Sequence, residues 1–147
     1  MGRILGIDYG SRRIGLAISD PLEITAQPYA TWRRTEESDL VSRITALVRS
    51  ENVVRVILGF PLTLKGTKSR RSLATESFAG RLTDACCVPV SLWDERLTTV
   101  QAHRALHQMG RAPSRTRERV DMIAAALMLQ SYLDGQSKIP TSELKDD

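Results

Sequence analysis

Five short apolar segments, rich in β-branched residues, constrain the fold of this chain more than any other feature of its sequence. They occupy residues 4–8, 14–19, 29–32, 53–58 and 88–93. A cluster of turn residues separates the first two, which predicts an antiparallel hairpin. Helical patterns separate the later segments, and strands joined through helices should be parallel neighbours. The sequence therefore predicts an α/β protein with a mixed sheet.

Apolar residues at helical spacing predict the connecting helices. The first helix should cover about residues 36–50, and a second should follow the polar, basic stretch 63–72. Thr98 can cap a third helix that reaches about Met109, and a last helix should end near Gly135. The positions that carry the spacing in the first, second and last helices are Leu40, Ile44, Leu47 and Val48; Leu73, Phe78 and Leu82; and Val120, Ile123, Ala124, Leu127 and Met128.

Length and composition point to one domain. The 147 residues, 41% of them hydrophobic, supply one sizeable core. We expect this domain to span residues 1–137 and to be followed by a polar, flexible tail over residues 138–147. No apolar run approaches the roughly 20 residues of a membrane span, and the N-terminus lacks a signal-peptide layout. The only cysteines, Cys86 and Cys87, are adjacent, which excludes a disulfide-built scaffold.

Four carboxylates follow the ends of expected elements. Asp8 ends the first strand, Asp94 and Glu95 follow the last strand, and Asp121 lies about one turn into the last helix. The carboxyl ends of central parallel strands meet at a ligand crevice, to which a packed helix could also bring Asp121. Gathered acids repel one another unless a cation intervenes, and Mg²⁺ or Mn²⁺ prefers such oxygen ligands. Ions held this way can promote hydrolysis of a phosphodiester bond.

Each acid also has a purely structural interpretation. Asp8 could serve the chemistry of the following turn. Asp94 or Glu95 could cap the helix that follows Thr98, and Asp121 could pair with Arg117 one turn earlier. Composition and periodicity alone therefore indicate an α/β domain with a candidate acidic edge.

Basic residues form two clusters in a chain whose net charge is +4. A polyanion is one interpretation of these clusters, and a solvated basic surface is the other. The clusters comprise Lys65, Lys68, Arg70 and Arg71, and then Arg111, Arg115, Arg117 and Arg119.

Four blocks of the sequence, in order, resemble those of the YqgF/RuvX family. The blocks are GIDYGSRRIGLA at residues 6–17, GFPL at 59–62 with Gly66 and Thr67 behind it, DERLTT at 94–99, and Asp121 with Ala124 and Ala125 followed by LQSYL at 129–133. They span the chain to about residue 134, and four blocks in register are specific. Phe60 stands where many members have Leu, an apolar exchange from which we expect no functional effect.

The resemblance implies an RNase H-like fold with strand order 3-2-1-4-5 and a Mg²⁺- or Mn²⁺-dependent nuclease of the bacterial cytoplasm. Members of the family are viewed as processing the 5′ end of pre-16S ribosomal RNA or as Holliday junction resolvases. The catalytic and metal-binding acids of the family carry over to Asp8, Glu95 and Asp121, and Asp94 is the weaker choice in its pair. The predicted contacts with structured RNA or branched DNA are Arg12, Arg13, Lys65, Lys68, Arg70, Arg71, Arg96, Arg115, Arg117 and Arg119.

Two other classes of protein fit parts of the pattern. In one half of an actin-like or sugar-kinase-like ATPase, Asp8, Gly10 and Ser11 would face phosphate, although such proteins usually need two domains. A non-catalytic module would bind nucleic acid with a salt-dependent affinity and never cut it. Within the nuclease interpretation, a resolvase favours a two-fold dimer, whereas an RNA-trimming enzyme can act as a monomer.

Overall fold

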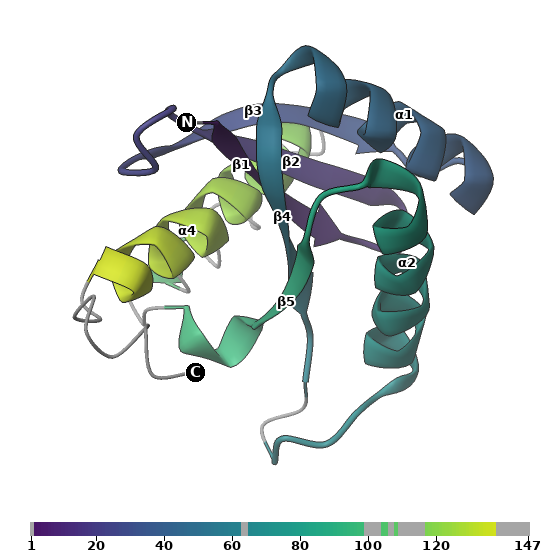
Figure 1. Cartoon of the computed structure of the whole chain (residues 1–147). Coiled ribbons are helices and arrows are strands. Elements are labelled where there is room, and N and C mark those ends of the chain that lie inside the picture. Colours follow the sequence, from purple (N-terminus) through teal and green to yellow (C-terminus); the bar gives the residue numbers. More distant parts are fainter. Residues whose placement is uncertain (1, 63–64, 99–103, 106–107, 109–116, 138–147) are drawn as a thin grey trace, which may run out of the picture.

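The fold is seen in a computed structural model that describes residues 2–62, 65–98, 104–105, 108 and 117–137 (Figure 1). Five strands form one sheet in the order β3-β2-β1-β4-β5, which confirms the expected order. Their bounds are Arg3–Tyr9 for β1, Arg13–Ser19 for β2, Ala26–Arg33 for β3, Val53–Phe60 for β4 and Val90–Asp94 for β5.

The sheet is mixed, as the sequence predicts. Strands β1 and β2 form an antiparallel hairpin, and β3 continues the antiparallel pairing on the outer side of β2. Strand β4 runs parallel to β1, and β5 runs parallel to β4. The carboxyl ends of β1, β4 and β5 therefore lie at the same edge of the sheet.

Helices cover both faces of this sheet (Figure 1). Helices α1 (Glu37–Ser50) and α2 (Arg70–Cys86) pack together on one face, and α4 (Arg117–Ser137) crosses the other. A short 3₁₀ turn, η1 (Glu95–Leu97), follows β5 directly. No described helix is long and apolar enough to cross a membrane.

The sheet divides the hydrophobic core into two layers, and β1 shows how. Leu5 and Ile7 belong to the larger cluster under α1 and α2, whereas Ile4 belongs to the smaller cluster under α4. Successive side chains of a strand point to opposite faces. Asp8 therefore shares the α4 face with Ile4 and Gly6.

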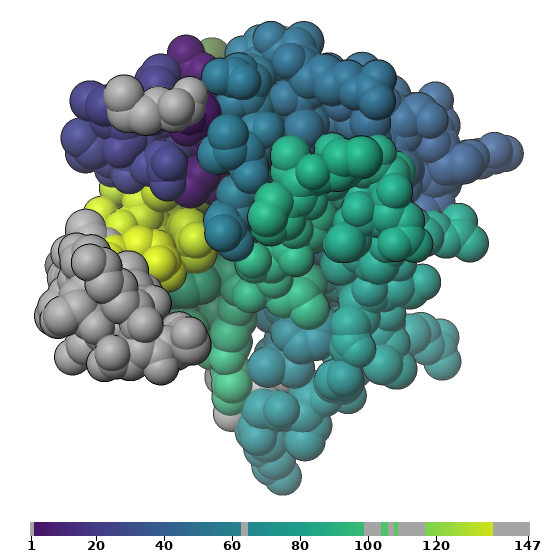
Figure 2. Space-filling model, viewed as in Figure 1, coloured from purple at the N-terminus to yellow at the C-terminus, as the bar shows by residue number. Residues whose placement is uncertain are grey.

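The structure departs from several expected boundaries. Strand β3 begins at Ala26 rather than at residue 29, and β5 begins at Val90 rather than at residue 88. Strand β4 continues through Gly59 to Phe60, beyond its expected end. Helix α2 begins at Arg70, inside the stretch expected to be a loop, because Ser69 accepts a hydrogen bond from the Ser72 backbone and caps the helix. The described residues that precede α2, 65–69, project from the rest of the molecule (Figure 2).

Two predictions fall largely outside the described residues. The expected helix from Thr98 to Met109 is described only at residues 104–105 and 108, which are helical, and Thr98 itself follows η1. The expected tail, residues 138–147, lies entirely outside the described residues.

Candidate active site

Strand β1 delivers Asp8 to the α4 face at the carboxyl edge of the sheet. The side chain is partly buried, and its carboxylate has no hydrogen-bond partner among the described residues. The backbone carbonyl of Asp8 accepts a hydrogen bond from Gly10 N at 3.2 Å, so the main chain, rather than the carboxylate, serves the turn. The carboxylate is left available for other chemistry.

Gly15 allows α4 to approach the strand next to Asp8. It lies directly opposite Asp8 in the β1–β2 register. A Cβ atom at this position would collide with the backbone carbonyl oxygen of Asp121. Any side chain at residue 15 would therefore push the start of α4 away from the hairpin that carries Asp8.

Asp121 lies on the buried side of α4. Ala125 and Leu129, four and eight residues later, are fully buried against the sheet, and residues at this spacing share one helix face. The carboxylate accepts a hydrogen bond from the guanidinium of Arg13 on β2 and forms an ion pair with it. The alternative that paired Asp121 with Arg117 is wrong, because Arg13 reaches it from the facing strand.

Glu95 reaches the same face from the far side of the edge. Asp94 ends β5 and caps η1 by accepting a hydrogen bond from Arg96 N at 3.0 Å, and it also pairs with the Arg96 guanidinium at 2.6 Å. Asp94 thus has the capping role that the sequence left open, in η1 rather than in a longer helix. A Cβ atom at Gly59 on β4 would lie 2.7 Å from Glu95 Oε1, so the Glu95 carboxylate lies over β4.

Electrostatic interactions link the three acids. Burial raises the pKa of Asp8, Arg71 partly offsets this rise, and the charge of Asp121 adds to it. Burial and then the negative charge of Asp8 raise the pKa of Glu95 to about 7, against the lowering effect of Arg71. Asp8 is therefore the central member, and it lies near both Glu95 and Asp121.

These carboxylates supply the oxygen ligands that hard divalent cations prefer. Asp8 and Glu95 fit such a cation well, because both are partly buried and neither has a hydrogen-bond partner among the described residues. Asp121, in contrast, is engaged by Arg13. Within the described part of the chain, no three acidic, histidine or cysteine side chains form a ready-made metal-binding group. The structure brings the predicted acids to one place but does not assemble them into a complete ligand set.

The predicted basic residues are placed less uniformly. The positive charge of Arg71 lowers the pKa of both Asp8 and Glu95. Lys68 pairs with Glu76 at 2.8 Å, and Arg96 pairs with Asp94. The predicted contacts that are exposed and form no ion pair with a described residue are Arg12, Lys65, Arg70, Arg71, Arg117 and Arg119. Arg115 lies outside the described residues.

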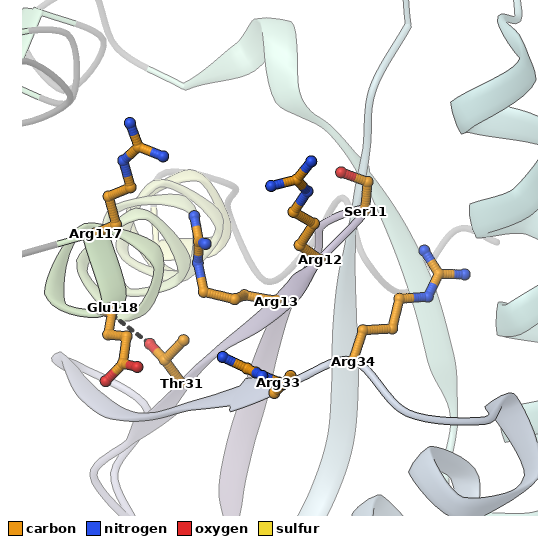
Figure 3. Close-up of a pocket in the computed structure, with 8 residues that line it drawn as sticks. All are labelled: Ser11, Arg12, Arg13, Thr31, Arg33, Arg34, Arg117 and Glu118. Atoms are coloured by element: carbon orange, nitrogen blue, oxygen red, sulfur yellow. Dashed lines mark hydrogen bonds between the residues drawn. The ribbon is translucent and has the colours of Figure 1, made fainter. Parts of the chain in front are cut away.

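An arginine-lined cavity of about 710 Å³ lies between the end of the β2–β3 pair and the start of α4 (Figure 3). We call it the arginine pocket; the charged residues that line it are Arg12, Arg13, Arg33, Arg34, Arg117 and Glu118. The sequence interpretation missed Arg33 and Arg34, although two consecutive arginines at the end of an expected strand were a signal. A smaller cavity of about 240 Å³ is lined by Arg13 and Arg117 together with Asp121.

The fold and strand order define an RNase H-like α/β protein related in structure to junction resolvases. The structure of RuvC from T. thermophilus in complex with a Holliday junction substrate matches with a TM-score of 0.59, at 16% identity, over 93% of this chain and 98% of that chain. The Fowlpox virus resolvase in complex with Holliday junction DNA matches with a TM-score of 0.51, at 15% identity, over 92% of this chain and 99% of that chain.

The sequence comparison is more specific. The family profile of RuvX, described as Holliday junction resolvase, matches residues 2–135, and the chain belongs to this family. A relative from Syntrophus aciditrophicus is 45% identical over 141 residues, which cover 95% of this chain and 94% of the relative. A relative from Acetivibrio thermocellus is 46% identical over 140 residues, covering 93% and 99%. Both relatives bear the name "Putative pre-16S rRNA nuclease".

Proposed function

We propose that this protein is a metal-dependent nuclease that hydrolyses phosphodiester bonds during processing of the 5′ end of pre-16S rRNA in the cytoplasm. The observation that carries the proposal is the convergence of Asp8, Glu95 and Asp121 at one sheet edge, with the charge of Asp8 coupled to both other acids. Membership of the RuvX family and the names of its relatives favour a nuclease over the ATPase interpretation.

The proposed catalytic acids are also the proposed metal ligands. Asp8, Glu95 and Asp121 would hold Mg²⁺ or Mn²⁺, which would lower the pKa of an attacking water and stabilise the leaving oxygen. Without a cation, Glu95 is partly protonated at neutral pH because its pKa is about 7. A nearby positive charge favours the ionised carboxylate. Cation binding should therefore release a proton from Glu95.

Two arginines place positive charge at this acidic edge, which favours binding of a polyanion. Arg71 offsets the negative charge of Asp8 and Glu95, and its exposed side chain can also contact a phosphate. Arg13 holds the Asp121 carboxylate on the opposite side of the edge. An incoming strand would thus meet a positive side chain on each side of the acids, which reduces the repulsion between the acids and the phosphates.

A junction resolvase is the second candidate, because the family description and two structural relatives refer to Holliday junctions. These structural relatives are only 16% and 15% identical to the chain, which supports a common fold. The relatives named for pre-16S rRNA are 45% and 46% identical. We therefore favour RNA as the substrate.

The direct test is to incubate the purified protein with a 5′-extended 16S rRNA precursor fragment and, separately, with four-way DNA. Each reaction is run with Mg²⁺, Mn²⁺ or EDTA. We expect cleavage of the RNA with a divalent ion and none in EDTA. The Asp8→Asn variant should be inactive, whereas Asp84→Asn, which removes an exposed acid of α2, should be as active as wild type.

Cleavage of the four-way DNA alone would replace the RNA proposal with the resolvase candidate. Binding of either substrate without cleavage under any metal condition would contradict the nuclease proposal and favour a non-catalytic module.

A further inference from the structure

The strongest unassigned feature is the arginine pocket. Arg13 and Arg33 are direct cross-strand partners at the end of the β2–β3 pair. Like charges at such positions destabilise a sheet. Arg12 precedes β2, and Arg117 approaches from α4 on the other side of the cavity (Figure 3). Positive charge is thus concentrated where three separate elements meet.

Few acids balance this charge. Arg13 is the only one of the five arginines that forms a salt bridge within the described part of the chain, and its partner is Asp121. Arg34 points away and binds Tyr9, through a 2.5 Å hydrogen bond to the hydroxyl and through its position over the ring. Glu118 is the only acid among the charged residues that line the pocket.

The pocket is also connected with the candidate catalytic edge. Arg13 and Arg117 line both the arginine pocket and the smaller cavity that contains Asp121. An anion bound in the arginine pocket would therefore lie near Asp121 rather than on an unrelated surface. Because a guanidinium can donate two parallel hydrogen bonds to a phosphate, such a cluster is suited to phosphate oxygens.

We propose that the arginine pocket is a phosphate-binding subsite that holds the nucleic-acid strand next to the bond being cut. Arg33 and Arg117 bind the phosphate, and Arg12 adds charge at the rim. The volume of about 710 Å³ exceeds the need of one phosphate and accommodates the attached sugar as well. This inference rests on the proposed nuclease function and adds a binding determinant on β3.

The subsite is tested by binding without cleavage. The affinity of a short fluorescent RNA carrying a 5′ hydroxyl is measured by anisotropy in EDTA over a range of salt concentrations. We expect Arg33→Gln and Arg117→Gln each to weaken binding by about tenfold, in line with the loss of one charge-assisted hydrogen bond. Each lost phosphate contact should also reduce the salt slope by about 0.7.

Arg49→Gln is the matched control, because Arg49 is an exposed arginine in the last turn of α1, on the opposite face of the sheet. It changes the net charge by the same amount and should leave affinity nearly unchanged. Equal losses in Arg49→Gln and Arg33→Gln would overturn the subsite, since only overall charge would then matter. Arg33→Lys should recover part of the affinity, and thermal melting confirms that each variant is folded.

A second arm distinguishes the source of the phosphate. If the pocket holds a backbone phosphate, Arg33→Gln weakens binding of 5′-hydroxyl and 5′-phosphorylated RNA by the same factor. If it holds a terminal phosphate, only the phosphorylated RNA loses affinity. Either result supports a phosphate subsite, whereas unchanged affinity for both RNAs contradicts it.

The binding assay separates this inference from the nuclease proposal. A specific loss in Arg33→Gln, together with a wild-type protein that never cuts, would retain the subsite and remove the nuclease. Metal-dependent cleavage by wild type, with unchanged binding and cleavage in Arg33→Gln, would retain the nuclease and remove the subsite.

Discussion

The negative charges on the two sides of the acidic edge, the strand side with Asp8 and Glu95 and the helix side with Asp121, are compensated in different ways. On the strand side, Asp8 and Glu95 are partly buried, have raised pKa values and have no hydrogen-bond partners among the described residues. On the helix side, Asp121 is held in an ion pair by Arg13. The comparison teaches that the protein's own side chains compensate the charges of Asp8 and Glu95 only in part, whereas Arg13 neutralises the charge of Asp121.

The free energy of cation binding should therefore differ between the two sides of the edge. A cation between Asp8 and Glu95 would relieve their mutual repulsion and the effect of burial. To recruit Asp121 as well, it would have to compete with the Arg13 guanidinium. The ion pair of Asp121 should therefore stabilise the folded protein when no cation is bound. The uncompensated charges of Asp8 and Glu95 should instead favour cation binding.

Asp8→Asn gives the largest expected effect, because it removes the acid coupled to both others. We expect cleavage to fall to background in Mg²⁺ and Mn²⁺, while the free energy of unfolding in EDTA stays unchanged or rises as repulsion is relieved. A gel-based cleavage assay and urea denaturation measure the two quantities. Wild-type cleavage by this variant, or a marked loss of stability, would contradict the role given to the strand side.

The strand side should also give stability a distinctive pH dependence. The folded protein holds the Glu95 proton up to about pH 7, whereas the unfolded chain releases it near the ordinary glutamate pKa of 4.5. Stability from this group is therefore fully present below pH 4.5 and is lost as the pH rises to about 7, by about 1.4 kcal/mol per unit of pKa difference. Urea denaturation in EDTA across this range, with wild type and Glu95→Gln, should show a decline that the variant lacks. If the stability of wild type and of Glu95→Gln changed with pH in the same way, the raised pKa of Glu95 would be contradicted.

Asp121→Asn should lower stability where Asp8→Asn does not. It breaks the ion pair and leaves the partly buried Arg13 without its partner, at a cost of about 1 kcal/mol. Urea denaturation in EDTA measures this loss, with Asp84→Asn as a control for the removal of an exposed acid on α2. Equal stability of Asp121→Asn and Asp8→Asn would remove the distinction between the two sides.

Arg71→Gln should give the smallest effect. The loss of its charge should raise the pKa of both Asp8 and Glu95 further, and only slightly because Arg71 is exposed. Arg70→Gln is the control, because it removes the neighbouring charge, which contributes no identified effect on either acid. An NMR titration of the Glu95 carboxyl carbon measures this change in pKa. Identical titrations for the two variants would show that Arg71 affects the pKa of Glu95 no more than Arg70 does.

The sequence predicted the strand side of the edge better than the helix side. The apolar runs located both strand ends, and the alternation of a strand determines the face on which Asp8 lies. The sequence also located α4, but not the residue that its acid contacts. Arg13 and Asp121 are separated by 108 positions, and no local pattern encodes such a contact.

The close approach of α4 was equally hidden in the sequence. Gly15 looked like part of a strand, and only the packing of α4 shows that a side chain there would collide with the backbone at Asp121. Arg33 was missed for a related reason, because its partnership with Arg13 depends on the register between β2 and β3. Local patterns identified the elements, whereas register and helix packing determined which charged groups meet.

The central claim is that acids from both sides of the edge hold a divalent cation together. The most direct measurement is the anomalous scattering of a crystal soaked in Mn²⁺. We predict a manganese peak in contact with the carboxylates of Asp8, Glu95 and Asp121, with Asp121 released at least partly from Arg13. A soaked crystal with no peak at these acids, or with manganese bound only elsewhere, would contradict the account.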